Sequence, residues 1–274
     1  MHLKIDHIKQ FALFYLICFS GCYLWFVANG LLFSEINPVF FLNRLDFTGN
    51  VFMLSNIQYA LIEYKWLRVL WDAVYLILPF VLVYTVYFSK KGQVVWAIAT
   101  AVFALLYNYF FSMMSFVSIE GFVAWMFIPL VFAAKGTKGF YFATHCIRIL
   151  FLLFFFTTAL WKIRSGGVFN PDQLSAILFK QHLPILVAGD DYWFSRFISF
   201  LINHQRFTYL IYLLVVIIEF VFVVGFFTRK YDRLLILFFC FFVLFDYFLM
   251  EINYFAWFPF LGCLYFSGLT LEEA

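Results

Sequence analysis

Long apolar segments follow one another along the chain, and most are separated by short polar turns. A membrane-crossing helix needs about 20 mostly apolar residues. Runs of this kind occur at 11–33, 69–88, 94–118, 121–134, 139–162, 207–227, 234–250 and 254–268. The fourth and eighth runs are short, so their boundaries are the least defined. The pattern predicts an all-α transmembrane helical bundle of about eight spans, with seven or nine as alternatives, that forms one membrane domain over 1–274.

The composition supports a membrane protein and excludes several other classes. Hydrophobic residues make up 66% of the chain and charged residues 12%, whereas soluble domains are about 45–50% apolar and about 25% charged. A globular protein of this length could not bury so much apolar surface. The net charge of +3 is too small for a nucleic-acid-binding surface, and the five cysteines contain no Cys-x-x-Cys pair that would indicate a metal site.

The distribution of Lys and Arg predicts the orientation, because cytoplasmic loops carry an excess of these residues. The short turns at 90–91, 135–138 and 229–233 are all basic. With the N-terminus inside, the inner segments hold nine cations and four anions, and the outer segments hold eight of each. Both termini are therefore expected inside. We expect an integral, multi-pass protein of the bacterial cytoplasmic membrane.

The two outer segments 34–68 and 163–206 are long enough to contain short helices. Asn170 suits a helix cap, with Pro171 at the first helical position. An amphipathic helix is predicted over 171–181, and its apolar face comprises Leu174, Ile177, Leu178 and Phe179. A second is predicted from Trp193, Phe194, Phe197, Ile198 and Leu201.

Three charged residues fall inside the spans at comparable depths counted from the basic turns: Arg148, Glu219 and Asp246. Charges in a span are costly and usually face the interior of the bundle, where they pair or carry function. We therefore predict that the three form one cluster. It is either a structural salt bridge, or a site in which one carboxylate accepts a proton or binds a headgroup. His145, one turn before Arg148, would bond to a neighbouring helix or contact the same ligand, and no metal site is expected.

Lys162 ends the fifth span beside Trp161, and two interpretations of it stand. Its side chain either extends to the membrane interface, or faces a partly dry outer cavity in which a neutral amine acts as a general base. Thr158, one turn earlier, would line that cavity. Asn108, inside the third span, needs an internal partner. Asp72, near the outer end of the second span, is expected to meet water or a cation of an outer loop.

A family pattern emerges from the second half of the chain. The sequence Phe-Thr-Thr-Ala-Leu-Trp-Lys-Ile at 156–163 precedes an outer stretch through His182, a span with Glu219, a basic turn, and a span with Phe245 and Asp246. This order resembles the HTTM domain, the membrane domain shared by vitamin K-dependent gamma-carboxylase and many bacterial proteins. The resemblance covers about residues 100–268.

The resemblance implies a helical bundle with an active-site cavity that opens to the outer side. By this resemblance, Lys162 is the base that deprotonates a reduced quinone, and Glu219 and Asp246 tune or orient it. The ligand is expected to be a quinone or another isoprenoid-like lipid in an apolar pocket with few polar anchors. The candidate ligand contacts are Asn108, His145, Arg148, Thr158 and His182.

The chain also departs from the family pattern. Trp161 stands where the carboxylase has the first of two adjacent lysines, and the histidine of its later span falls near Asp246 or Tyr247 here. The chain ends at Ala274 without the large lumenal portion that binds substrate in the carboxylase. We therefore do not expect peptide carboxylation.

Two classes of function follow, an enzyme and a non-enzymatic subunit. The first is a membrane enzyme or redox-coupled protein that acts on a lipophilic molecule from the bilayer. The alternative is an accessory or scaffold subunit of an envelope complex, with the outer helices of 163–206 as its contact surface. A transporter is expected least, because the sequence shows no inverted repeat. The expected partners are the bilayer and either a lipophilic ligand or a membrane protein, and not a nucleic acid.

Overall fold

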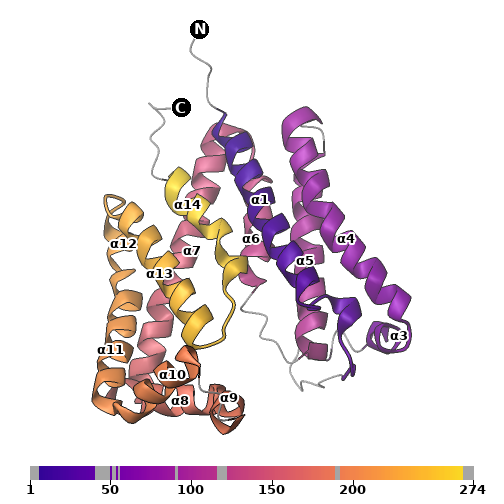
Figure 1. Ribbon diagram of the computed structural model, residues 1–274. Coiled ribbons are helices and arrows are strands. Elements are labelled where there is room, and N and C mark those ends of the chain that lie inside the picture. The colour runs from indigo at the N-terminus through magenta and orange to yellow at the C-terminus, as the bar shows by residue number, and fades with distance from the viewer. Residues whose placement is uncertain are drawn as a thin grey trace. The chain divides into compact units, whose positions relative to one another are not determined.

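The computed structural model of the chain describes residues 6–40, 50, 54, 56–89, 92–115, 122–188 and 192–267. All regular elements in these ranges are helices (Figure 1), which confirms the all-α prediction. Five helical segments are long and apolar enough to cross a membrane: His7–Glu35, Lys65–Ser89, Gln93–Ser115, Gly136–Arg164 and Gln205–Phe227. By the length and composition of its helices, the chain is a multi-pass membrane protein.

Each of the eight predicted runs contains a helix, but three of these helices fall outside the five. The helices α6 (Val123–Val131) and α14 (Pro259–Ser267) have nine residues each, or about 13 Å at 1.5 Å per residue, whereas the hydrocarbon core is about 30 Å thick. The 18 residues of α13 (Asp232–Leu249) include three charged ones. The count of eight spans and the orientation stay predictions, and the basic pair at 90–91 lies outside the described residues.

The chain divides into two compact units. The first comprises Met1–Ile147 and Phe255–Ala274, and the second comprises Arg148–Tyr254. The boundary falls inside the long helix α7 (Gly136–Arg164). Because the second boundary follows Tyr254, α13 and α14 belong to different units.

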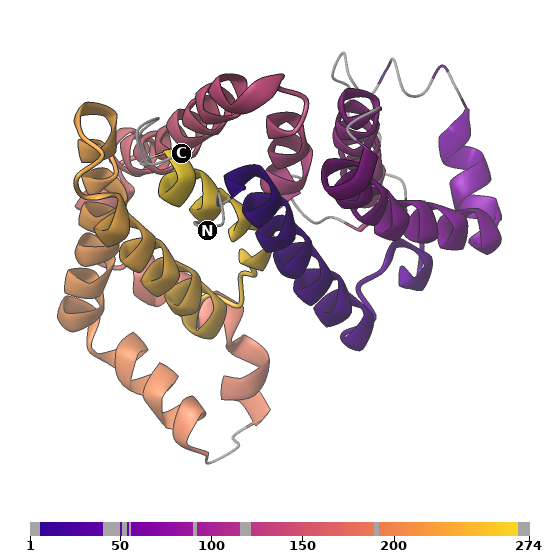
Figure 2. The ribbon, with the colours of Figure 1, turned by 90° about the horizontal axis from the view of Figure 1, so that it is seen from above.

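The first unit is built around α1 (His7–Ala28), α4 (Lys65–Tyr84) and α5 (Gln93–Ser115), with α6 packed on α5. Figure 2 shows α1 between α14 and α4. The short elements η1 (Phe33–Glu35) and α3 (Ile57–Glu63) contact α4, and η2 (Thr85–Ser89) continues it. Large aromatic side chains fill this core. The rings of Tyr75 and Tyr107, for example, stack with centroids 4.0 Å apart.

The second unit contains all of α13 and the part of α7 that begins at Arg148. The helices α11 (Gln205–Val221) and α12 (Val224–Phe227) lie between these two in the chain. The elements η4 (Gly167–Phe169), α8 (Gln173–Gln181), α9 (Leu183–Ala188) and α10 (Trp193–Asn203) precede α11. In Figure 1, α8, α9 and α10 gather at the end of α11 where that helix begins. One buried apolar cluster joins them to α7, α11 and α13: Ala159, Leu174, Leu178, Ile198, Leu201, Tyr212, Val216 and Leu249.

The helices predicted in the outer segment 163–206 are confirmed, with one difference in their bounds. α8 begins at Gln173 and not at position 171. The side-chain oxygen of Asn170 accepts a hydrogen bond from the backbone N–H of Asp172 at 3.1 Å, so these residues form a turn before the helix starts. Of the predicted apolar face, Leu174 and Leu178 are buried, whereas Phe179 is half exposed.

Gly225 of α12 lies where side chains of α7 and α13 leave no room for a Cβ atom. A Cβ atom at this position would lie 2.7 Å from Leu152 Cδ2 and 3.0 Å from Leu235 Cδ1. Gly225→Ala is therefore expected to lower the free energy of unfolding by about 1–3 kcal/mol through overpacking, measured by thermal unfolding in detergent. Gly21→Ala is the control, since nothing lies within 4 Å of its Cβ position. Equal melting temperatures of the two variants would contradict the prediction.

Candidate functional site

An ion pair between Lys162 and Glu219 lies inside the second unit. Lys162 Nζ donates to Glu219 Oε1 at 2.6 Å. Glu219 is fully buried, whereas the Lys162 side chain is 26% exposed. The lysine therefore directs its ammonium to a carboxylate of α11 and does not simply extend to the membrane interface.

The helical repeat explains how these two residues meet. On α7, Leu152, Phe155, Ala159 and Lys162 follow one another at spacings of three and four, so they share one face of the helix. The first three are buried in the second unit, and Lys162 stands at the end of this face. On α11, Tyr212, Val215 and Glu219 share a face in the same way and are also buried.

Asp246 of α13 lies within electrostatic range of this ion pair. It is 7% exposed and interacts electrostatically with both Lys162 and Glu219. The other oxygen of Glu219, Oε2, is buried and accepts no hydrogen bond from the residues that the structure describes. A buried acceptor without a donor is costly. The site of Lys162, Glu219 and Asp246 therefore has one acceptor available for a proton, a water molecule or a ligand donor.

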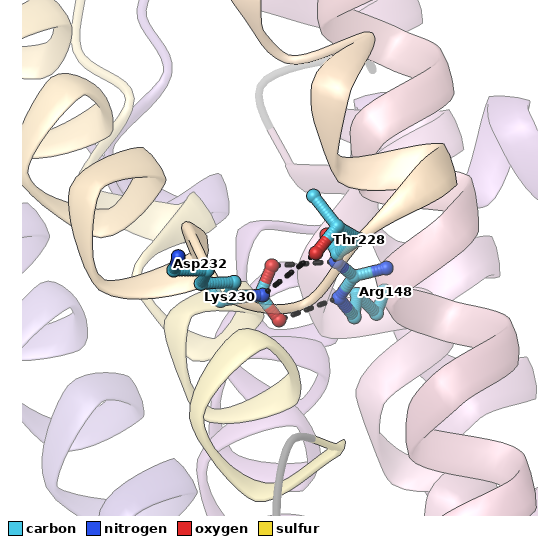
Figure 3. A network of polar contacts seen from close by, with 4 residues as sticks. All are labelled: Arg148, Thr228, Lys230 and Asp232. Carbon is cyan, nitrogen blue, oxygen red and sulfur yellow. Dashed lines mark hydrogen bonds and ion pairs between the residues drawn. The ribbon is translucent and has the colours of Figure 1, made fainter.

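Arg148 does not join this site, and the prediction of a three-residue cluster is wrong on this point. Its Nε donates to Asp232 Oδ2 at 2.8 Å, and its Nη2 donates to Asp232 Oδ1 at 2.5 Å and to the Thr228 carbonyl at 3.3 Å (Figure 3). Both charged side chains are buried. The long side chain of Arg148 extends from α7, so its guanidinium group reaches the turn between α12 and α13. The number of residues along α7 predicts the depth of the Cα atom of Arg148, but it does not predict where the guanidinium group lies.

His182 is buried between the helices α8 and α10 and the end of α13. Its Nε2 lies 2.8 Å from the Leu249 carbonyl oxygen, and its Nδ1 lies 3.2 Å from Glu251 Oε1, an ion-pair distance without hydrogen-bond geometry. The ring also makes an edge contact with Phe194. With 1% of the residue exposed, this histidine connects α8 and α10 to the end of α13.

The remaining three predicted ligand contacts are Thr158, Asn108 and His145. Thr158 is exposed and donates to the Phe154 carbonyl of its own helix at 2.8 Å. Asn108 lies in the first unit, where it finds internal partners as predicted: its Nδ2 donates to the Ala104 carbonyl at 2.7 Å and contacts the Tyr75 hydroxyl at 3.5 Å. His145 is half-buried on the part of α7 that belongs to the first unit.

Asp72 has a role that sequence reasoning missed. Its carboxylate accepts hydrogen bonds from the backbone N–H groups of Phe33 and Ser34, at 3.1 and 2.9 Å, and from the Tyr107 hydroxyl at 2.5 Å. The expected contact with water or an outer-loop cation is therefore wrong. An acidic side chain that caps a turn 38 residues earlier in the chain leaves no local sequence signal.

Two further observations concern metal binding and similarity to known proteins. In the part of the chain that the structure describes, no group of three His, Cys, Asp or Glu side chains could hold a metal ion. Among known proteins, no family model, curated protein or solved structure matches the chain.

Proposed function

We propose that the chain is a multi-pass membrane protein related to the HTTM family that binds the hydroxyl-bearing head of a lipophilic ligand at Lys162, Glu219 and Asp246. The ligand class is a reduced quinone or another isoprenoid-like lipid. The observation that carries this proposal is the buried Glu219 Oε2, which has no donor among the described residues. A hydroxyl group supplies the missing donor, and the exposed quarter of Lys162 gives the site an opening.

The charges of the site determine what it does chemically. Two acidic side chains and one amine give the site more acceptor oxygens than donors, so it favours a ligand that donates a hydrogen bond or a proton. In contact with Glu219, Lys162 is an ammonium and cannot accept a proton. It becomes a base once it passes its proton to Glu219. Its neutral amine then takes the proton of the ligand hydroxyl, and the resulting ammonium stabilises the oxyanion.

The surroundings of the ion pair suit an apolar ligand. Ala159 lies one turn before Lys162, and Tyr212 and Val216 of α11 belong to the same buried cluster. Phe155 of α7 stacks with Phe222 at the end of α11, and the two ring centroids are 4.1 Å apart. Sites for lipophilic molecules combine such apolar walls with a few polar groups that fix the orientation of the ligand.

Native mass spectrometry of the full chain, extracted gently from its membrane and supplied with a short-chain hydroquinone, tests the proposal. Wild type is expected to retain a quinone or isoprenoid mass. Glu219→Gln, which keeps the shape of the side chain, is expected to weaken binding about tenfold because a charge-assisted hydrogen bond is lost. Lys162→Met is expected to weaken it similarly.

The matched control is Lys180→Met, since Lys180 is an exposed lysine of α8. It is expected to bind as wild type does. A wild-type protein that binds neither its native lipids nor the added hydroquinone would contradict the proposal, as would unchanged binding by a folded Glu219→Gln protein.

One observation favours the scaffold alternative. Val187 of α9 and Trp193 of α10 are 76% and 75% exposed, and Phe200 of α10 is 46% exposed. Such apolar side chains outside the long helices lie against the membrane surface or against a partner protein. A protein partner at fixed stoichiometry in wild type and in every variant, with no small ligand, would support the scaffold function instead.

A further inference from the structure

The turn at 228–233 between α12 and α13 exposes its cations and buries its one acid, which its sequence alone does not indicate. Its sequence, Thr-Arg-Lys-Tyr-Asp-Arg, contains three cations and one anion. The anion, Asp232, is only 5% exposed and pairs with the buried Arg148. Arg229, Lys230 and Arg233 are exposed. The acid of the turn is thus neutralised from inside, and the outer side of the turn presents cations.

Contacts from inside the unit also fix the shape of this turn. Arg148 binds both carboxylate oxygens of Asp232 and the carbonyl of Thr228, and the hydroxyl of Thr228 accepts the backbone N–H of Lys230 at 3.2 Å (Figure 3). A turn held in this way presents its cations without a further loss of backbone entropy on binding.

The place of the turn along the chain indicates what its cations meet. The candidate span Gln205–Phe227 ends directly before the turn, so we expect Lys230 and Arg233 at the depth of the lipid headgroups. Phe227 and Tyr231 are 85% and 45% exposed, and Lys230 Nζ lies 5.8 Å from the centroid of the Tyr231 ring. Aromatic residues next to cations are typical of the membrane interface.

We propose that the turn at 228–233 binds the phosphate of anionic phospholipid headgroups, with Lys230 and Arg233 as the principal contacts. The charge and the depth of the turn together favour a lipid of the bilayer over a soluble anion. This inference does not depend on the ligand proposed at Lys162, because the two sites share no residue.

The test compares two lipids bound to the full chain in neutral detergent, as followed by native mass spectrometry. Wild type is expected to bind phosphatidylglycerol more tightly than phosphatidylcholine, and added NaCl is expected to reduce the difference. Each cation near an anionic surface strengthens binding about fivefold. The variant K230Q/R233Q is therefore expected to weaken phosphatidylglycerol binding about 25-fold and to leave phosphatidylcholine binding unchanged.

The matched control, K180Q/R206Q, removes the same charge from exposed positions on α8 and at the start of α11. It is expected to keep the preference for phosphatidylglycerol. An equal loss in both double variants would overturn the proposal, because net charge alone would then explain binding. A wild-type protein without the preference, or displacement of the lipid by the same concentration of inorganic phosphate, would overturn it as well.

Discussion

Replacement of Arg148 by methionine is expected to lower the free energy of unfolding by about 3–5 kcal/mol, because it leaves the carboxylate of Asp232 buried without its cation. Arg148 is 1% exposed and supplies three hydrogen bonds to Asp232 and Thr228. Its removal also leaves the Thr228 carbonyl without this donor. The measurement is chemical unfolding in mixed micelles.

Two further variants distinguish loss of the ion pair from a general loss of packing. Arg148→Met combined with Asp232→Leu is expected to recover most of the stability, since apolar side chains often replace a buried ion pair without loss. Arg206→Met changes an exposed arginine of α11 and is expected to unfold as wild type does. A double variant no more stable than Arg148→Met would show that the unpaired charge is not the cause.

In the first unit, Asp72→Ala is expected to lower the free energy of unfolding by about 2–6 kcal/mol. The N–H of Ser34 and the hydroxyl of Tyr107 lose their acceptor, whereas the N–H of Phe33 keeps a second acceptor, the Tyr107 hydroxyl at 3.3 Å. Each buried donor left without a partner costs about 1–3 kcal/mol. Thermal unfolding in detergent measures the change.

Asp72→Asn serves as the conservative comparison, because its amide keeps one acceptor oxygen. It is expected to be more stable than Asp72→Ala and less stable than wild type. Glu35→Ala, at an exposed acid of η1, is the control for charge and is expected to leave the melting temperature unchanged. If Asp72→Ala had the same melting temperature as Glu35→Ala, the hydrogen bonds from Phe33, Ser34 and Tyr107 to Asp72 would not stabilise the first unit.

The sequence was sufficient to predict the helices, because their signals are local. The long apolar runs gave the five helices that are able to cross a membrane, and the apolar periodicity of 171–181 and 193–201 located α8 and α10. The runs at 121–134 and 254–268 show the limit of hydropathy. A short apolar run has the same composition whether its helix spans a membrane or packs inside a bundle.

The partners of the buried charges could not be predicted from the sequence. Lys162 and Glu219 were each singled out, but their contact joins residues 57 positions apart. Arg148 was assigned the wrong partner, because depth along one helix does not determine the direction in which a long side chain points. Asp232 stands in a basic turn whose sequence does not mark it as buried, and only the tertiary structure turns it inward.

The helix α7 supplies the cations of two ion pairs, Arg148–Asp232 and Lys162–Glu219, and this has a mechanical consequence. Arg148 and Lys162 are fourteen positions apart, a rise of about 21 Å and an angular offset of about 40° around the helix axis. Both therefore point to nearly the same side. A rotation of this part of α7 about its axis would strain the contacts to Asp232 and Glu219 together. A ligand that rotated the helix at Lys162 would therefore also strain the contacts of Arg148 with the turn at 228–233.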